Sequence, residues 1–128
     1  AAAERIMEWT LEHCTRTKEG GRPISKRQAV QFALVEMLTE VKLARTFLEK
    51  LIADHMEKKS IVVEVSMAKY WTTELAKRLA ERSLDLIGPP AMRDSCPVGR
   101  ALRDVRVMSI FAGTNEIMKG IAAKFLRL

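Results

Sequence analysis

The best candidates for a chemically active site are Gly113 and Thr114, which stand between two segments of helical periodicity. Gly113 breaks the first segment, and Thr114 belongs to the residue types that cap a helix by accepting a hydrogen bond from an N–H of its first turn. Such a break leaves backbone N–H groups at the positive end of a helix. The pattern predicts a place where an anion or a carbonyl oxygen can bind, although many breaks of this kind are purely structural.

Other reactive residue types form no pattern typical of a catalytic or metal site. There is no Gly-rich phosphate loop and no nucleophile elbow. His13 and His55 stand alone in different segments, so we interpret both as surface or interface histidines. Glu4, Glu8 and Glu12 recur every four residues. They predict a solvated helical face, because bundle metal sites combine carboxylates with Glu-x-x-His pairs, and the chain has no such pair.

The two cysteines, Cys14 and Cys96, are too few for a disulfide framework. We predict that both are free and that at least one is a small buried hydrophobe, which favours a reducing, intracellular compartment. Mitochondrial, peroxisomal and bacterial cytoplasmic locations all fit. Trp9 and Trp71 are interpreted as core or interface anchors rather than cofactor-stacking residues.

The net charge of +6 raises the question of nucleic-acid binding. The 22 basic residues are spread along the chain and interleaved with 16 acidic ones, which indicates a solvated helical surface and no nucleic-acid partner. An anionic ligand would also suit a positive field. No apolar run reaches the roughly 18 residues that span a bilayer, and the first residues lack the basic flank of a signal peptide. We therefore expect no membrane partner.

Helical periodicity covers most of the chain. A first helix is predicted over 2–17 and stops at Gly20-Gly21 and Pro23; since no capping residue precedes it, we expect it to continue a longer helix. Ser25, three residues before Gln28, predicts a capping box that opens a second helix. The apolar stripe expected to face inward in this helix comprises Phe32, Val35, Leu38, Val41, Phe47, Leu48, Leu51 and Ile52.

The second half of the chain predicts three more helices. Lys58-Lys59-Ser60 supplies a turn before a long helix that Gly88-Pro89-Pro90 ends. A connector and a short helix over 98–110 follow, and Thr114 caps a last helix whose inner stripe is Ile117, Ile121, Ala122 and Phe125. The prediction is an all-α fold: an antiparallel, up-down four-helix bundle with one additional short helix.

The segment from Pro97 to Leu128 resembles the C-terminal end of acyl-CoA dehydrogenases. That family's pattern is approximately Pro-Val-Glu-Arg, two residues, Arg-Asp and, several residues later, Glu-Gly-Thr-Asn-Glu-Ile. This chain has Pro97-Val98, Arg100, Arg103-Asp104 and Gly113-Thr114-Asn115-Glu116-Ile117 in the same order. Upstream, Ser66-Met67-Ala68-Lys69 is similar to the Ser-Met-Ala-Lys of the family's penultimate long helix. Residues 1–59 agree in helix length and order more than in motif.

The resemblance implies that residues 1–128 are the C-terminal helical bundle domain of a larger subunit. It implies an FAD enzyme of fatty acid metabolism that oxidises an acyl-CoA at its α,β carbons, with electron-transfer flavoprotein as acceptor. It also implies a homotetramer packed through this bundle. Substrate contacts are expected at Ala112 and Gly113, and FAD contacts at Thr114 and Glu116. Gly88 and Arg16 are further positional candidates for FAD.

The chain departs from the family pattern at three places. The Glu that precedes Gly-Thr in many members, and acts there as the base, is Ala112; a methyl group accepts no proton. The resemblance to the isovaleryl-CoA and long-chain branches implies a base on an earlier helix, before Ala1. The Gly-Gly-x-Gly turn that approaches a neighbouring subunit's FAD reads Gly88-Pro89-Pro90-Ala91, and the Arg-x-Thr-Phe-Gly motif is replaced by the stretch that follows Arg16.

Two hypotheses follow from these observations. In the first, the domain contributes FAD and substrate contacts and an oligomer interface to an active enzyme, and is inactive when isolated. In the second, it is a non-enzymatic helical assembly domain of the same ancestry. Thr114 and Glu116 fit both, because they are also a helix cap and an early-helix acid favoured by the helix dipole.

Overall fold

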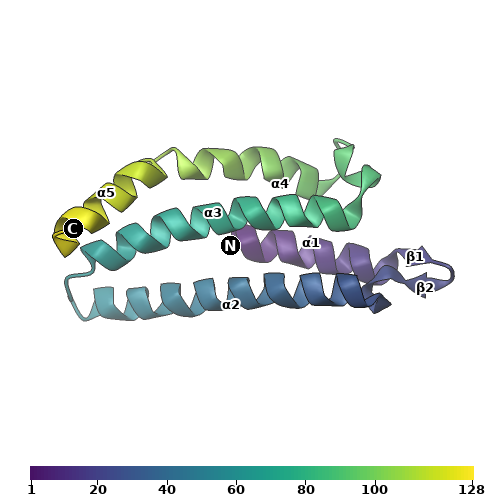
Figure 1. Cartoon of the computed structure of the whole chain (residues 1–128), viewed down its shortest axis with the longest axis horizontal. Helices are drawn as coiled ribbons and strands as arrows, with labels where there is room; N and C mark the ends of the chain where they lie inside the picture. The colour runs from purple at the N-terminus through teal and green to yellow at the C-terminus, as the bar shows by residue number, and fades with distance from the viewer.

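A computed structural model of the chain describes residues 1–128 and contains five α-helices (Figure 1). The helices are α1 (Ala2–Arg16), α2 (Gln28–Met56), α3 (Val62–Ile87), α4 (Pro97–Val105) and α5 (Asn115–Leu126). The rods α1, α2 and α3 run antiparallel to their chain neighbours, and α4 with α5 forms the fourth rod. The predicted up-down bundle with an additional short helix is therefore confirmed.

The helix α3 lies at the centre of the bundle and packs against the other four helices. Its Leu75 and Leu79 are fully buried among Ile6 of α1, Met37 of α2 and Val98 of α4. Burying each of these side chains contributes about 1.5–3 kcal/mol to the free energy of unfolding. This core occupies the half of α3 that α1 covers.

Polar contacts fix the packing of α1 and α2 on α3. The buried hydroxyls of Thr10 and Ser83 are hydrogen-bonded at 2.8 Å, and Thr10 also donates to Ile6 O. On the outer side, Arg78 pairs with Glu40 at 3.0 Å. Surface ion pairs contribute little stability. We therefore infer that they help to set the register of the helices, and that most of the free energy of folding comes from the core.

A two-stranded antiparallel hairpin, which the sequence analysis did not predict, joins α1 to α2. Its strands are β1 (Lys18–Glu19) and β2 (Arg22–Pro23), and Gly20 and Gly21 occupy its turn with φ values of 56° and 80°. Both values lie in the left-handed region that glycine adopts at little cost. Gly20-Gly21 thus reverses the chain as well as ending the helical pattern.

The predicted capping box at Ser25 is wrong. Ser25 lies within a 3-10 helix over Ile24–Lys26, and α2 begins after Arg27, which makes no side-chain cap. The buried Ile24 explains the shift, because packing it against the core draws this turn inward. Tertiary packing here outweighs the local capping signal.

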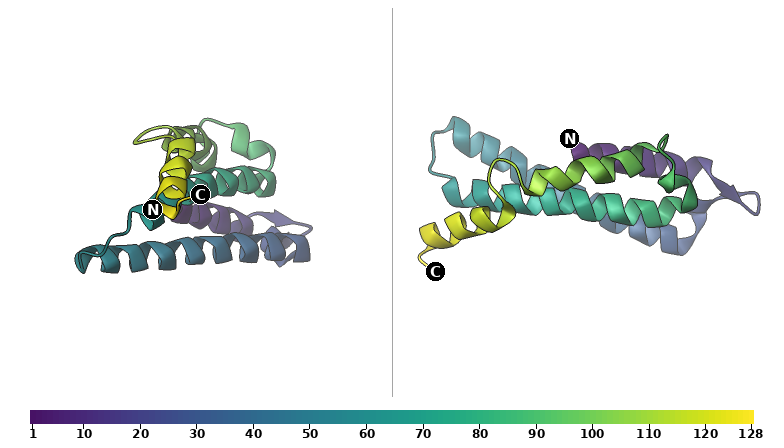
Figure 2. Two further views of the ribbon diagram at one scale, coloured as in Figure 1. Left: turned by 60° about the vertical axis from the view of Figure 1, so that its left-hand side comes forward. Right: turned by 90° about the horizontal axis from the view of Figure 1, so that it is seen from above.

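The last two helices also differ from prediction in detail. The α-helix predicted over 98–110 ends at Val105 and continues as a 3-10 helix over Arg106–Ser109. The chain then bends, and α5 continues in the general direction of α4 and packs along the start of α3 (Figure 2). In α5 only Ala122 of the predicted inner stripe is buried, whereas Ile117 and Phe125 are more than half exposed.

The apolar stripe predicted for α2 is likewise only partly covered. Leu51 is buried, but Phe32 and Val35 are about 60% exposed, at 59% and 62%. Leu48 and Ile52 face a groove that no other helix fills. Periodicity therefore identified the helix but not the length over which a neighbour covers it. None of the helices combines the length and apolarity that crossing a membrane requires.

Candidate functional site

The corner between α4 and α5 brings together four of the residues singled out by sequence. After the 3-10 turn, Ala112 has a φ of 54° and Gly113 a φ of 95°. The left-handed region suits glycine but costs alanine about 1–2 kcal/mol. Such strain persists only where the surrounding structure holds it in place. The side chain of Ala112 is exposed, so it is held by the backbone on either side of it.

Thr114 caps α5 as predicted. Its hydroxyl accepts a hydrogen bond from the Ile117 N–H at 3.3 Å, and its carbonyl accepts from the Met118 N–H at 3.0 Å. The next acid, Glu116, is exposed, and its pKa lies below the usual range because its carboxylate accepts hydrogen bonds from its own backbone N–H and from Thr114. The start of α5 is thus a positive helix end with an ionised carboxylate beside it.

The corner contains several backbone hydrogen-bond donors without a partner in the chain. The backbone N–H groups of Ala112, Gly113 and Thr114 donate to no oxygen of the chain. The carbonyl of Gly113, in contrast, accepts a hydrogen bond from the Lys69 ammonium at 2.6 Å. The corner therefore offers donors to an electron-rich oxygen, as the Gly-Thr break predicted.

A polar network that the sequence analysis missed lies beneath the corner. Asn115 is only 3% exposed, and its amide oxygen accepts hydrogen bonds from Lys69 at 3.1 Å and from Thr73 at 3.0 Å. Its amide nitrogen donates to Glu74 at 2.7 Å, and Lys77 also pairs with Glu74. The signal in the sequence was a row of polar residues spaced by four, at 69, 73 and 77, which places them on one face of the helix.

Burial raises the pKa of Glu74, but hydrogen bonds from Lys77 and Asn115 lower it more, so the net pKa is below its usual value. Glu74 is therefore ionised at neutral pH and accepts both hydrogen bonds. With these bonds, the described side chains leave no buried nitrogen or oxygen atom unpaired. A fully paired network of this kind holds one arrangement.

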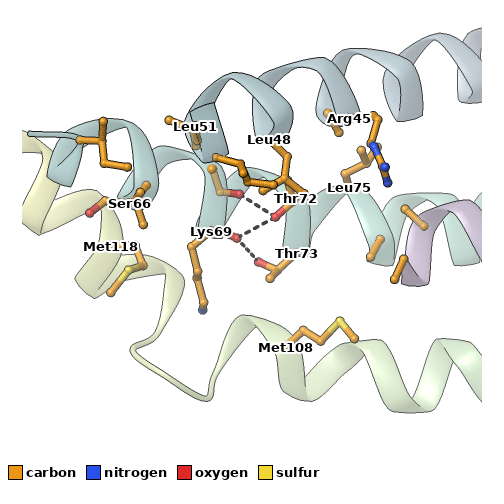
Figure 3. A pocket seen from close by; sticks show the side chains of 18 of the residues that line it. Arg45, Leu48, Leu51, Ser66, Lys69, Thr72, Thr73, Leu75, Met108 and Met118 are labelled. Atoms are coloured by element: carbon orange, nitrogen blue, oxygen red, sulfur yellow. Dashed lines mark hydrogen bonds between the residues drawn. The ribbon is translucent and has the colours of Figure 1, made fainter. Parts of the chain in front are cut away.

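A groove of about 1010 Å³ runs beside the corner, between α2 and α3. It is closed at one end by the first residues of α1 and flanked by Met108 and Met118 (Figure 3). Of its 26 lining residues, 17 are hydrophobic. The hydroxyl of Thr72, which also faces the groove, donates to the carbonyl of Ala68 in its own helix at 2.6 Å. The wall is therefore largely apolar, with the Lys69 ammonium at its edge.

Gly88 and Arg16 lie at the opposite end of the bundle. Gly88 ends α3 with a φ of 72° and is followed by a 3-10 helix over Pro89–Met92, so the predicted stop is confirmed. Arg16, at the end of α1, is exposed and pairs with Glu12. The structure thus separates these two candidates from the corner, and one chain does not combine them into one site.

The remaining candidates, the two cysteines and the glutamates of α1, lie in surroundings that indicate a structural role. Cys14 and Cys96 are free, and Cys14 is buried, as predicted; burial also raises the pKa of its thiol. Glu4 and Glu8 pair with Arg45 and Arg5 on the surface. Within residues 1–128, no three His, Cys, Asp or Glu side chains come together as metal ligands do.

Gly99, which the sequence analysis did not single out, is required by close packing. A Cβ at this position would lie 2.4 Å from the backbone oxygen of Ala91. Glycine therefore lets α4 approach the Pro89–Met92 turn.

Comparisons with known proteins agree with the resemblance in motif. Residues 1–127 match the family described as "Acyl-CoA dehydrogenase, C-terminal domain". The chain is 33% identical over 124 residues to the mitochondrial long-chain specific acyl-CoA dehydrogenase of Rattus norvegicus, covering 97% of this chain and 29% of that protein. The chain thus spans about a third of the length of its curated relatives.

Solved structures are similar over nearly the whole chain. An acyl-CoA dehydrogenase from Geobacillus kaustophilus superposes with a TM-score of 0.96 at 44% identity, covering 99% of this chain and 33% of that one. The FAD complex of PigA superposes with a TM-score of 0.91 at 26% identity, covering 98% and 33%.

Proposed function

Because the chain belongs to the acyl-CoA dehydrogenase family through its C-terminal domain, we propose that it forms part of a flavin-dependent acyl-CoA dehydrogenase. The full subunit oxidises an acyl-CoA thioester at its α,β carbons. The observation that carries this proposal is the donor-rich corner at Ala112–Thr114, which lies beside an apolar groove. The similarity to a long-chain specific acyl-CoA dehydrogenase and to PigA in its FAD complex supports it.

The residues of the corner divide between substrate and cofactor. Ala112 and Gly113 offer N–H groups to the thioester carbonyl, whose oxygen gains negative charge as the α-proton leaves. Thr114 and Glu116, at the start of α5, contact FAD. The donor set fits an electron-rich acceptor, and the chemistry that FAD supplies when bound is acceptance of a hydride from the β-carbon.

The base for this reaction comes from outside residues 1–128 in our proposal. The methyl group of Ala112 accepts no proton. The carboxylates nearest the corner already have partners: Glu116 accepts hydrogen bonds from its own backbone N–H and from Thr114, and Glu74 is bonded within the network beneath the corner. Residues 1–128 alone are therefore expected to be inactive. We propose that the base is a carboxylate on a segment that precedes Ala1 in the full subunit.

Gly88 and Arg16 serve a different flavin from the corner. Since they lie at the other end of the bundle, we assign them to the FAD of a neighbouring subunit in a homotetramer. Exposed apolar side chains on α2 and α5, among them Phe32 at 59% and Phe125 at 58%, supply surface for such assembly. The same surface would also serve a non-enzymatic assembly domain, but the relatives named as acyl-CoA dehydrogenases do not favour that alternative.

The decisive experiment is flavin absorbance of the full-length protein, followed by ferrocenium reduction with acyl-CoAs of different chain lengths. We expect a yellow protein that reduces ferrocenium with at least one acyl-CoA. Electron-transfer flavoprotein is the proposed physiological acceptor, and it should replace ferrocenium. A colourless, inactive full-length protein would leave only the assembly domain.

A further inference from the structure

We infer that Lys69 is a positioning residue that sets which way the Gly113–Thr114 peptide faces, and so keeps the Thr114 N–H directed out of the bundle. This inference deepens the proposed function, on which only its ligand-binding consequence rests. Lys69 was singled out by motif, but neither the substrate nor the cofactor contacts proposed above use it.

The hydrogen bond from Lys69 spans the two elements that form the site. Its Nζ donates to the Gly113 carbonyl at 2.6 Å and to the Asn115 amide oxygen at 3.1 Å, across 44 and 46 residues of chain. Lys69 pairs with no carboxylate. A charged donor to a carbonyl forms a stronger hydrogen bond than a neutral one. The ammonium is the donor to the Gly113 oxygen, and it shares the Asn115 oxygen with the hydroxyl of Thr73.

The direction of the Thr114 N–H follows from the geometry of the peptide bond. In a trans peptide, the C=O of one residue and the N–H of the next point in opposite directions. No cis peptide is present in the chain. Because Lys69 draws the Gly113 oxygen toward α3, the Thr114 N–H must point away from α3.

The Gly113–Thr114 peptide needs the hydrogen bond from Lys69 because its first residue is a glycine. Gly113 has no Cβ, and glycine adopts positive and negative φ about equally well. The peptides on either side of a glycine can therefore reorient at low cost. Without Lys69, the Gly113 carbonyl is free to turn outward, which would present an acceptor where the ligand requires a donor.

The partners of Lys69 are themselves held in one orientation. The Asn115 side chain places its oxygen toward Lys69 and its nitrogen toward Glu74, which carry opposite charges. An inverted amide would face its nitrogen to the ammonium and its oxygen to the carboxylate. Lys77 keeps Glu74 in place from the other side at 3.2 Å.

The first test uses the 128-residue chain, in which no flavin is needed. We compare wild type with Lys69→Met, which keeps the length but removes the donor, and Lys69→Gln, which keeps a neutral donor. Lys124→Met is the control, because Lys124 is an exposed α5 residue whose side chain makes no hydrogen bond or ion pair in the structure. Backbone ¹⁵N relaxation dispersion should show new exchange at residues 112–115 in Lys69→Met, weaker exchange in Lys69→Gln and none in the control.

The second test uses the full-length holoenzyme. Lys69→Met should raise the Kd for FAD about tenfold, the size expected when a charged hydrogen bond is lost, with Lys69→Gln between it and wild type. Lys124→Met should leave the Kd unchanged. A purely structural role would lower the unfolding midpoint without changing FAD affinity in the remaining folded protein.

The outcomes separate the two proposals. A wild-type full-length protein that binds no FAD refutes the proposed function, while the dispersion experiment still decides the role of Lys69. Sharp, unchanged signals for residues 112–115 in Lys69→Met overturn the inference, whatever the flavin result. Should Lys69→Met not fold, Lys69→Gln and direct detection of the wild-type Lys69 ammonium protons, slowed in exchange by the Gly113 bond, decide the question.

Discussion

The two halves of α3 have different roles. The half after Leu75 is enclosed by α1 and α4 and buries Leu79, Ala80 and Ser83 completely. The half before it faces the groove and the corner, and it carries Lys69 and Thr73 in a hydrogen-bonded network. The enclosed half maintains the bundle through apolar packing, whereas the other half positions polar groups at the site.

The largest difference should appear between a leucine in the enclosed half of α3 and a leucine of α2 that lines the groove beside the open half. Leu79→Ala removes a completely buried side chain and should lower the free energy of unfolding by about 2–5 kcal/mol. Leu48→Ala, facing the groove and 43% exposed, should cost less than about 1 kcal/mol. Urea unfolding measures both; equal losses would contradict the division into an enclosed half and an open one.

Asn115→Ala tests the polar network on the site side. The change leaves Lys69 and Glu74 without their shared partner and should cost about 1–3 kcal/mol, the usual penalty for unpaired buried groups. Thr39→Ala is the control, because its hydroxyl is exposed and bonds only within its own helix. A loss for Asn115→Ala no greater than that of Thr39→Ala in thermal unfolding would mean that the network adds nothing to stability.

Thr114→Ala should lower stability by about 1 kcal/mol, because the Ile117 N–H loses its capping acceptor. Thr114→Ser keeps the hydroxyl and should remain close to wild type. Circular dichroism during urea titration measures both. If the serine variant loses as much as the alanine variant, the methyl group of Thr114 matters more than its cap.

Ala112→Gly should increase stability, by about 0.5 kcal/mol. The substitution relieves an alanine held at a φ of 54°, and the greater freedom of glycine in the unfolded chain cancels part of the gain. Ala53→Gly, at an exposed position within α2, should instead destabilise by about 1 kcal/mol. A destabilised Ala112→Gly variant would show that the corner is not strained.

The smallest expected effect is the pH dependence that Glu74 contributes. Its pKa is lowered in the folded state, so its stabilising contribution is fully present above its unfolded pKa of about 4.3. The contribution is lost as the pH falls through the lower folded value. The urea midpoints of wild type and Glu74→Gln should therefore converge below pH 4, with Glu81→Gln as control; a constant gap would contradict this.

Much of the bundle could be predicted from local patterns. The long central helix starts and stops where its flanking turn and Gly88-Pro89-Pro90 place it, and Thr114 caps the last helix as its residue type predicts. These signals act within a few residues, so they are readable along the chain. The hairpin at Gly20-Gly21 was missed because two-residue strands carry no periodicity.

The candidate site was predicted only in part. Gly113 and Thr114 were identified from their residue types and their motif, and Ala112 and Glu116 from their positions in the same motif. Asn115 was missed as a network residue, because an asparagine in a first helical turn has an ordinary local explanation. The same holds for Gly99, whose need for close packing depends on Ala91 of another element.

Periodicity, helix breakers and caps thus decided the number, order and direction of the helices, because those features depend on neighbours within a turn or two. The choice of covered and open faces, and the meeting of Lys69 with a carbonyl 44 residues away, depended on how the rods pack. Long-range partners are selected by shape and charge in three dimensions. Only the folded bundle brings them within hydrogen-bonding distance.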